Sequence, residues 1–367
     1  MLPISVCMIV KNEEKHIRQA LESVKAYVNE MIVLDTGSTD NTRCIAENSG
    51  AIVYDKPWNN SFADMRNVCM SYANQPYILM LDADERLRVC DMEVMEHALR
   101  AMGRGEGCVG DVVIRSSTQS GEVSESTITR LFPNRPDFKY QGRIHEQLVY
   151  KQGTVKSIRS GIIIDHFGYQ EEEIQRKDKY RRNLSLIQAS LETNENDSYL
   201  LFQLGRTYYV MKDYPSAAEA LTKCIASMGS TKQHYLSTAY LTLGYTYIHL
   251  KEWGLFEKCL NDAIDFYPDY TDLYYMYGTA LVEAKNPEWL TYIPEAFMNC
   301  LQLGAPISSK YETVAGVGTY KAHYNLGVYY ELTGNIELAL YHYEQGSSYN
   351  YELANHSVIR LKQLIKE

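Results

Sequence analysis

The first 115 or so residues alternate between short apolar runs and stretches with the apolar spacing of a helix. Short apolar runs are typical of buried strands, and a spacing of three to four residues is typical of an amphipathic helix. The resulting β-α-β-α-β order predicts a parallel sheet with helices on both faces. The predicted strands are 4–10, 31–34, 51–54 and 77–81, and the predicted helices are 12–26 and 61–73.

The stretch from 116 to 170 has a less regular pattern. Alternation of apolar and polar residues around 109–115 and 126–132 predicts two more strands. A loop containing Pro133 and Pro136 follows them.

From residue 172 onward the sequence is helical and repeats itself. Four glycines recur in the same phase of the pattern, and a mid-helix glycine costs about 1 kcal/mol relative to alanine. Neighbouring helices therefore have to approach too closely there for a side chain. The spacing matches tetratricopeptide repeats, which are about 34 residues long, and the wider gaps indicate insertions. The glycines are Gly205, Gly244, Gly278 and Gly327.

These patterns predict two architectures in one chain. Residues 1–170 are expected to form an α/β domain with a Rossmann-like, mostly parallel sheet. Residues 171–198 are expected to be linking helices. Residues 199–367 are expected to form an all-α, tetratricopeptide-like solenoid.

Composition excludes several classes of protein. The 36 Lys and Arg against 46 Asp and Glu leave a formal charge of −10, which argues against a general nucleic-acid binder. The chain has no apolar run of about 18 residues, so we expect no membrane span. Its first residues read directly into a strand without the features of a signal peptide. The eight cysteines include no CxxC pair, which is typical of reduced thiols, and we expect a cytoplasmic protein.

Tyrosine dominates the aromatic residues, with 31 Tyr against 8 Phe and 3 Trp. Many of these tyrosines stand at repeat positions of the second half, where a ring packs between helices. The excess therefore indicates helix packing rather than a sugar-binding platform. In the first half, Trp58 and Tyr140 remain as candidates for contact with a sugar.

Polar residues directly follow the predicted strands, and parallel sheets bind ligands at the carboxyl ends of their strands. Asp82 and Asp84 follow the run YILML. Two carboxylates at a strand end can hold Mg²⁺ or Mn²⁺ against a diphosphate. A lone DxD pattern is a weak signal, because acidic turns are common. By contrast, the GxGxxG spacing that begins at Gly105 precedes a strand and opens no helix, so we interpret it as a flexible loop and not as a dinucleotide site.

Four ordered blocks over residues 5–85 resemble the family 2 glycosyltransferases of GT-A fold. They are SVCMIVKNEEKHI, EMIVLDTGSTDNT, PWNNSFADMRN and YILMLDADE. The later block TRLFPN…YQGRIHE and the repeat-containing tail resemble a bacterial subgroup that includes the sublancin-type peptide S-glycosyltransferases. The resemblance covers nearly the whole chain and is stronger up to residue 170 than in the repeats.

The resemblance implies roles for residues near the first two strands. Asp35 would contact the nucleotide base, and the backbone around Val10 and Asn12 would line the same pocket. Arg66, in the FAxxRN pattern, would lie near the diphosphate. The alternatives are a turn carboxylate for Asp35 and a helix-surface salt bridge for Arg66.

The resemblance also implies a metal site. Asp82 would bind the ribose, and Asp84 would bind the metal. His166 resembles the late histidine that often completes the metal site of this fold, and a neutral imidazole is a good ligand for Mn²⁺. The alternative for His166 is a histidine of the core.

His145 and Glu146 form the candidate reactive pair. An inverting transferase needs a base for the proton of the acceptor, and a carboxylate suits that task. We therefore favour Glu146 as the base, with His145 assisting it or binding phosphate; the alternative is a loop salt bridge between Glu146 and Arg143. The pair does not extend to HExxH, because residue 149 is Val149. A thiol acceptor would reduce the need for a base.

The sequence thus predicts a metal-dependent, inverting glycosyltransferase. Mn²⁺ or Mg²⁺ would be its cofactor and a UDP-sugar its donor. Its acceptor would be a peptide or protein, at a Cys thiol or a Ser hydroxyl, and the repeats would bind the peptide or form a homodimer. One alternative is a transferase for cell-envelope or lipid-linked glycans. Another is a tetratricopeptide scaffold with an inactive nucleotide-binding domain.

Overall fold

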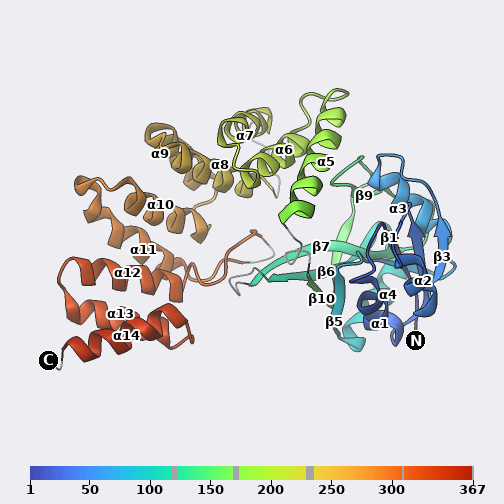
Figure 1. The fold of residues 1–367 in the computed structure, drawn as a ribbon, viewed down its shortest axis with the longest axis horizontal. Coiled ribbons are helices and arrows are strands. Elements are labelled where there is room, and N and C mark those ends of the chain that lie inside the picture. The colour runs from blue at the N-terminus through green and yellow to red at the C-terminus, as the bar shows by residue number, and fades with distance from the viewer. Residues whose placement is uncertain (118–122, 168–172, 229–234, 308–309, 366–367) are drawn as a thin grey trace. The chain divides into compact units, whose positions relative to one another are not determined.

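The computed structural model describes residues 1–117, 123–167, 173–228, 235–307 and 310–365 (Figure 1). The chain divides into two compact units, Met1–Asn194 and Glu195–Glu367. Helix α5 (Glu173–Leu191), in the stretch expected to link two domains, is part of the first unit. In the part of the chain that is described, no helix combines the length and the hydropathy of a membrane span.

An eight-stranded sheet forms the centre of the first unit, in the order β3-β2-β1-β4-β7-β6-β10-β5. Neighbouring strands from β3 to β4 are parallel, β6 and β10 are parallel to each other, and β7 and β5 run against their neighbours. The predicted mostly parallel sheet is therefore confirmed. The strands are β1 (Leu2–Val10), β2 (Val28–Asp35), β3 (Ile52–Asp55), β4 (Tyr77–Met80), β5 (Glu85–Cys90), β6 (Cys108–Ser117), β7 (Val123–Pro133) and β10 (Lys156–His166).

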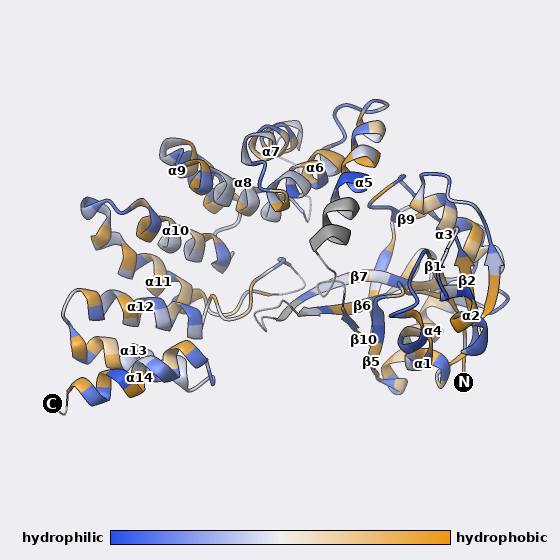
Figure 2. Ribbon diagram, in the orientation of Figure 1, coloured by the Kyte–Doolittle hydropathy of each residue, from blue (hydrophilic) through white to orange (hydrophobic). Residues whose placement is uncertain are grey.

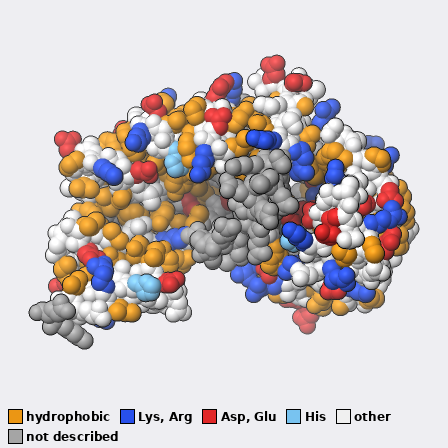
Figure 3. Space-filling model, viewed as in Figure 1, with side chains coloured by type: hydrophobic (Ala, Val, Ile, Leu, Met, Phe, Trp, Pro, Cys, Tyr) orange, Lys and Arg blue, Asp and Glu red, His pale blue; other side chains and the backbone are white. Residues whose placement is uncertain are grey.

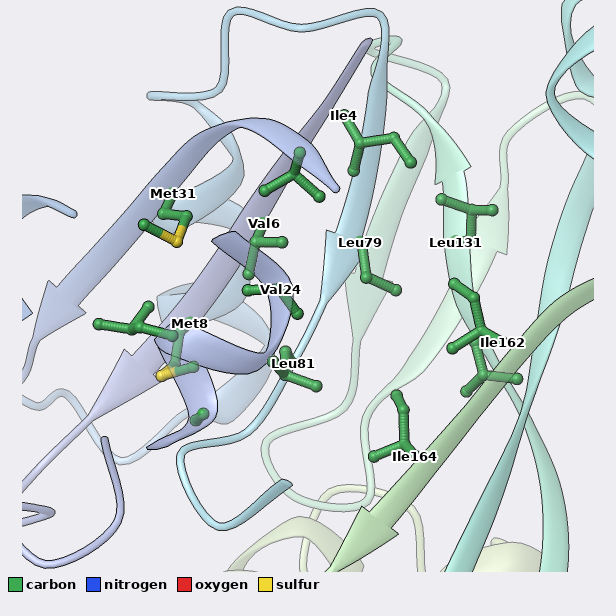
Figure 4. Packing of buried hydrophobic residues seen from close by; sticks show 14 of the residues in the cluster. Ile4, Val6, Met8, Val24, Met31, Leu79, Leu81, Leu131, Ile162 and Ile164 are labelled. Carbon is green, nitrogen blue, oxygen red and sulfur yellow. The ribbon is translucent and has the colours of Figure 1, made fainter. Parts of the chain in front are cut away.

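Helices cover both faces of this sheet, because its strands carry apolar residues on both sides. In β1, Ile4, Val6 and Met8 belong to one buried cluster and Cys7 to another, as the two-residue period of a strand requires (Figure 4). The first cluster packs against α1 (Ile17–Lys25), α2 (Thr42–Asn48) and α4 (Met92–Arg104). The second packs against α3 (Phe62–Met70) and against a hairpin of β8 (Phe138–Gln141) and β9 (Gln147–Tyr150).

Three features differ from the sequence-based expectation. The stretch expected to be a loop after Pro133 contains the β8–β9 hairpin, and strands β5 and β10 were not predicted. These strands are short, or they alternate charged with apolar residues, so the local pattern is weak. The GxGxxG stretch is not a flexible loop: Gly105 caps α4 and Gly110 lies inside β6. A Cβ at Gly110 would lie 3.0 Å from the Leu131 side chain, so the glycine allows close packing of β6 on β7.

The second unit is built of helices that follow one another as antiparallel neighbours (Figure 1). Hydrophobic and hydrophilic residues alternate along them (Figure 2), as expected for helices packed on one side. The predicted tetratricopeptide-like array is confirmed. Its elements are α6 (Ser198–Val210), α7 (Tyr214–Met228), α8 (Leu236–Leu250), α9 (Trp253–Phe266), α10 (Thr271–Ala284), the 3₁₀ helix η2 (Pro287–Tyr292), α11 (Ile293–Leu303), α12 (Tyr320–Leu332), α13 (Ile336–Ser347) and α14 (Glu352–Leu364).

The four repeat glycines are the points of closest approach between these helices. A Cβ added to any of them would lie within 2.6 Å of a side chain on another helix. Two of these side chains are aromatic, namely Phe297 against Gly278 and Tyr343 against Gly327. Close approach therefore explains the recurrence of glycine, as expected from the sequence.

Gly278→Ala is expected to destabilise the protein by about 1–2 kcal/mol. The Phe297 ring is 1% exposed and cannot move aside easily, and overpacking of about 1–3 kcal/mol outweighs a propensity gain of about 1 kcal/mol. Denaturant unfolding followed by circular dichroism measures the difference. Gly254→Ala in α9 is the matched control, because its Cβ would meet no atom within 4 Å. Equal effects of the two substitutions would contradict this explanation.

A buried histidine pair connects α12 to α13. The Nδ1 atoms of His323 and His342 are 3.0 Å apart, so one proton is shared between the two rings. His342 is 6% exposed and stacks on Tyr330. Burial, followed by the charge of His323, lowers the pKa of His342 to about 4.

The pair is expected to make stability depend on pH. Because the folded state lowers the pKa of His342, its contribution is complete above about pH 6.5 and is lost as the pH falls toward about 4, with a loss of about 2 kcal/mol near pH 5. Thermal unfolding of wild type and His342→Phe at about pH 7.5 and about pH 5 tests this. The variant keeps a ring at position 342 but has no imidazole there that can bind a proton. Its loss of stability on acidification should therefore be smaller than that of wild type. An equal loss in both proteins would exclude the pair as the cause.

Candidate functional site

The carboxyl ends of three neighbouring parallel strands meet at one edge of the sheet. Strands β2, β1 and β4 are adjacent there, with Val10 beside Asp35 in register. Asp82 comes two residues after the end of β4. This edge is where open parallel sheets bind ligands.

The loops after β1 and β2 hold each other through side chains. The Asn12 backbone N–H donates to Ser38 Oγ at 2.9 Å, and Asn12 Oδ1 accepts from the Thr39 backbone at 2.8 Å. Asn12 has a φ of 58°, a left-handed conformation that asparagine tolerates better than most residues. Both loops are therefore set in one arrangement before any ligand binds.

Asp35 and Thr36 close the end of β2. Asp35 is 5% exposed, and its Oδ1 accepts from the backbone N–H groups of Gly37 at 2.9 Å and Ser38 at 2.7 Å. Thr36 donates from both its backbone N–H and its hydroxyl to the Val10 carbonyl, each at 2.9 Å. The turn role considered for Asp35 is thus present, on one of its two carboxylate oxygens.

Asp82 lies between two buried arginines. Its Oδ1 accepts from Arg66 Nη2 at 3.0 Å and its Oδ2 from Arg130 Nη2 at 2.8 Å. Burial raises the pKa of Asp82, but the charges of Arg130 and Arg66 outweigh it and hold that pKa well below its ordinary value. Arg66 is 6% exposed, so it is not the helix-surface residue of the alternative interpretation. Both oxygens of Asp82, the expected ribose ligand, are engaged by arginines.

Glu85 extends this chain of charges. It accepts from the Asp82 backbone N–H at 2.9 Å and from Arg130 Nη2 at 3.2 Å. Burial raises the pKa of Glu85 to about 7, against the attraction of Arg130. Arg130 thus connects two carboxylates from the start of β5 and the end of β4.

Glu146 joins the network from the hairpin side. Arg66 Nε donates to Glu146 Oε1 at 2.5 Å, so the partner of Glu146 is Arg66 and not the Arg143 of the alternative interpretation. The preceding His145 has a φ of 52°. This left-handed conformation lies just before β9, in the loop that contacts α3.

Helix α3 holds the hairpin through three further bonds. The Asn67 side chain donates to the Tyr140 carbonyl at 2.9 Å and accepts from the Tyr140 N–H at 2.8 Å. The Phe62 N–H donates to the Arg143 carbonyl at 2.8 Å. Tyr140 itself is buried, with Arg66 5.5 Å from its ring centre, and burial raises its pKa to about 12. The ring belongs to the core of this unit and not to a sugar-contacting surface.

Asp84 and His166 form a separate polar pair. His166 Nε2 lies 3.2 Å from Asp84 Oδ2, and His166 Nδ1 lies 3.3 Å from Ser116 Oγ. Within the described ranges, no three His, Cys, Asp or Glu side chains gather as a metal-ligand group. A divalent ion here would take two protein ligands, which suits Mg²⁺ or Mn²⁺ because such ions keep waters and bind substrate phosphates.

The comparison with protein families decides the nature of this domain. Residues 5–167 match the model of the family described as glycosyl transferase family 2. The first domain of the chain belongs to glycosyl transferase family 2. The resemblance seen in the four sequence blocks is therefore confirmed.

Two curated proteins are similar to parts of this chain. A TPR repeat-containing protein of Synechococcus elongatus is 34% identical over 213 residues, 56% of this chain and 52% of that protein. The SPbeta prophage-derived glycosyltransferase SunS of Bacillus subtilis is 31% identical over 229 residues, 61% of this chain and 53% of that protein. The chain thus spans about half the length of these relatives.

Solved structures similar to the chain cover about half of it. MamA is 19% identical with a TM-score of 0.39, over 49% of this chain and 94% of MamA. YrrB, a TPR protein, is 19% identical with a TM-score of 0.37, over 50% of this chain and 86% of YrrB. The repeat fold of this chain rests on its own helices and glycine contacts.

Three residues of the family 2 site were not predicted from the sequence. Arg130 and Glu85 lie within recognised blocks, TRLFPN and LDADE, but only the pairing of β4 with β7 brings them together. Asn67 directly follows Arg66 in the FAxxRN pattern, and this adjacency is the sequence feature that could have indicated its role. A buried charge partner distant in sequence has no local pattern that would reveal it.

Arg130→Met is expected to lower the free energy of unfolding by about 3 kcal/mol, because it leaves the buried Glu85 carboxylate without its arginine and removes one of the two arginines on Asp82. Arg88→Met on β5 is the matched control. Arg88 pairs with Asp165 at 3.0 Å but is 51% exposed, so its loss is expected to cost less than about 1 kcal/mol. Denaturant unfolding of both variants measures the contrast, and a similar cost would mean that Arg130 is not a structural centre.

Proposed function

We propose that the chain is a metal-dependent, inverting glycosyltransferase that moves a sugar from a nucleotide-sugar to a peptide or protein. The observation that carries the proposal is the position of the family 2 residues. The pocket residues after β1 and β2, Arg66 on α3, and the Asp84–His166 pair all belong to the carboxyl side of one sheet.

The nucleotide would bind after β1 and β2. Asp35 would contact the base with its second carboxylate oxygen, since the turn occupies Oδ1. The backbone at Val10 and the loop at Asn12 would line the pocket. The interloop hydrogen bonds support this assignment, because a preformed pocket loses less conformational entropy when the nucleotide binds. A UDP-sugar is the first donor to test.

Asp84 and His166 would hold the divalent ion. When bound, Mn²⁺ or Mg²⁺ would stabilise the negative charge that develops on the departing diphosphate. His166 can ligate through Nε2 only if its proton is on Nδ1. Ser116 Oγ is placed to accept that proton, and such partners fix the orientation of ligating histidines.

Arg66 and Glu146, which pair with each other, would serve the leaving group and the acceptor. The Arg66 guanidinium would favour the diphosphate leaving group. Its Nη1 is buried and has no protein partner among the described residues, and an anionic ligand would supply one. Glu146 would take the acceptor proton, because it is the carboxylate that the hairpin loop brings next to Arg66. His145, next to it, would assist or bind phosphate. Each oxygen of Asp82 already accepts from an arginine. Asp82 would therefore bind the ribose through the second lone pair of one of these oxygens.

The acceptor side rests on the resemblance to peptide S-glycosyltransferases and on the second unit. Helical repeat arrays present extended surfaces suited to peptides. A Cys thiol or a Ser hydroxyl would be the nucleophile. All eight cysteines of the chain are free, which supports work in a reducing compartment such as the cytoplasm. A homodimer through the repeats is a further prediction.

Asp84→Asn is expected to lower turnover of UDP-sugar by at least about 100-fold, because electrostatic stabilisation of the leaving group typically contributes that much. Transfer or hydrolysis is read by mass spectrometry with Mn²⁺ present. Asp165→Asn is the matched control on β10, since Asp165 pairs with the exposed Arg88. Full activity of Asp84→Asn with Mn²⁺ would overturn the metal assignment.

A panel of UDP- and GDP-sugars, with peptides containing Cys or Ser and with glycan acceptors, identifies the substrates. Transfer to a peptide would support the proposal, and transfer to a glycan alone would favour the envelope alternative. Calorimetric titration with UDP and Mn²⁺ tests the alternative that the protein is a scaffold and not an enzyme. No binding would favour a scaffold with an inactive domain.

A further inference from the structure

The connection between α11 and α12 is a closed loop within the repeat unit. A Cβ at Gly318 would lie 1.9 Å from the Gly304 carbonyl oxygen, so the two ends of the loop touch backbone to backbone. Loops of this length with adjacent ends are compact and frequently functional. This loop is the insertion that widens the glycine spacing between Gly278 and Gly327. In Figure 1 it leaves the array between α11 and α12 and runs back toward helices earlier in the chain.

Residues 310–314 of this loop, here named the strap, contact α6 and the start of α10. Arg206 of α6 donates to both carboxylate oxygens of Glu312, at 3.0 and 3.2 Å. The two residues are 106 positions apart in the chain. Such a bidentate pair is more specific in geometry than a single charge contact.

An aromatic contact fixes the middle of the strap. The Tyr311 ring stacks on Tyr270, with centroids 4.3 Å apart and planes at 12°. The Tyr311 hydroxyl donates to Asp269 at 2.6 Å, and Lys310 pairs with the same carboxylate at 2.5 Å. Tyr311 is 2% exposed, so the face before α10 receives its whole side chain.

Asp272 completes the contact through the strap backbone. Its carboxylate accepts from the Thr313 hydroxyl at 2.6 Å and from the Val314 N–H at 2.9 Å. Tyr270 donates to the Glu312 carbonyl. Asp272 is 3% exposed, and a buried carboxylate that lost these two donors would be costly. This face therefore requires an occupant that supplies an N–H and a hydroxyl.

The strap is held as a bound peptide is held. Residues 311–314 belong to no helix or strand, and the backbone N–H of Tyr311 donates to the Ile307 carbonyl at 3.1 Å. Every residue of the strap has a partner on α6 or near the start of α10. Asp269 receives Lys310 and Tyr311, Arg206 receives Glu312, and Asp272 receives Thr313 and Val314. Recognition of this kind reads an extended segment by its order of side chains and its main chain. On the side seen in Figure 3, hydrophobic side chains, tyrosines included, gather over the repeat helices, a surface suited to such a segment.

We propose that the strap is an internal ligand of a peptide-binding face formed by Arg206, Asp269, Tyr270 and Asp272, and that a partner peptide replaces it there. The peptide is an extended segment in which an aromatic residue is followed by an acidic residue and then by a hydroxyl residue. The strap competes at high effective concentration because it is tethered. A peptide that lacks the order of aromatic, acidic and hydroxyl residue makes fewer contacts than the strap and therefore does not displace it. The proposal does not depend on the reaction of the first unit.

Binding of a fluorescent peptide with the strap sequence KYETVAG tests the proposal by anisotropy. Glu312→Gln combined with Thr313→Val weakens the strap and leaves Tyr311 in place. This variant is expected to bind the peptide at least about 10-fold more tightly than wild type, since a competitor that occupies the site reduces apparent affinity by the fraction of sites left open. Adding Arg206→Gln is expected to remove the gain. Glu219→Gln in α7, an exposed carboxylate paired with Lys223, is the control and should bind as wild type does.

A folded strap variant that binds no more tightly than wild type, or a gain that survives Arg206→Gln, would overturn the proposal. A scrambled peptide that binds equally well would also overturn it. Hydrogen exchange of the unmodified protein gives a second test that needs no variant. Saturating peptide should increase exchange of the Val314 amide, because it displaces the strap from Asp272. Unchanged exchange at saturation would contradict displacement.

Discussion

Asp82 is the residue on which the arrangement of the first unit depends. The guanidinium groups of Arg66 and Arg130 are buried and would be unstable without a counter-charge, and the half-buried carboxylate of Asp82 pairs with both. Through these two arginines the same charge network reaches Glu85 and Glu146. It thereby connects α3, β4, β5, β7 and the β8–β9 hairpin. Residues from all five elements are needed before every one of these charges has its partners.

The candidate site is held in place by two separate sets of contacts. After β1 and β2, hydrogen bonds between the two loops hold them to each other. On the reacting side, Glu146 has its place because α3 holds the hairpin through Arg66 and Asn67. Arg66, which contacts Glu146, and Asn67, which holds the hairpin, are adjacent residues of the same FAxxRN pattern.

The second unit obeys a different constraint. Its helices can stack closely because glycine stands where a neighbouring side chain needs the space, as Phe297 does against Gly278. The same array departs from regular repeats where the loop closed by Gly304 and Gly318 is inserted. That departure brings the strap onto α6 and the start of α10. Regular packing thus provides the face, and the irregular insertion provides the segment that occupies it.

The sequence by itself determined the features that repeat locally. Apolar runs indicated the strands up to β4, glycine phase indicated the repeats, and four blocks indicated family 2. Strands β5, β8, β9 and β10 escaped notice, because short strands with charged residues carry little local signal. Only the tertiary structure decided that Asp82 has both oxygens on arginines, that Glu146 pairs with Arg66 and not Arg143, and that Glu312 reaches Arg206. Each of these pairs joins residues distant in the chain, so none leaves a periodic trace in the sequence. For the buried Arg66 and Arg130, burial makes an unpaired charge costly and thereby selects such partners.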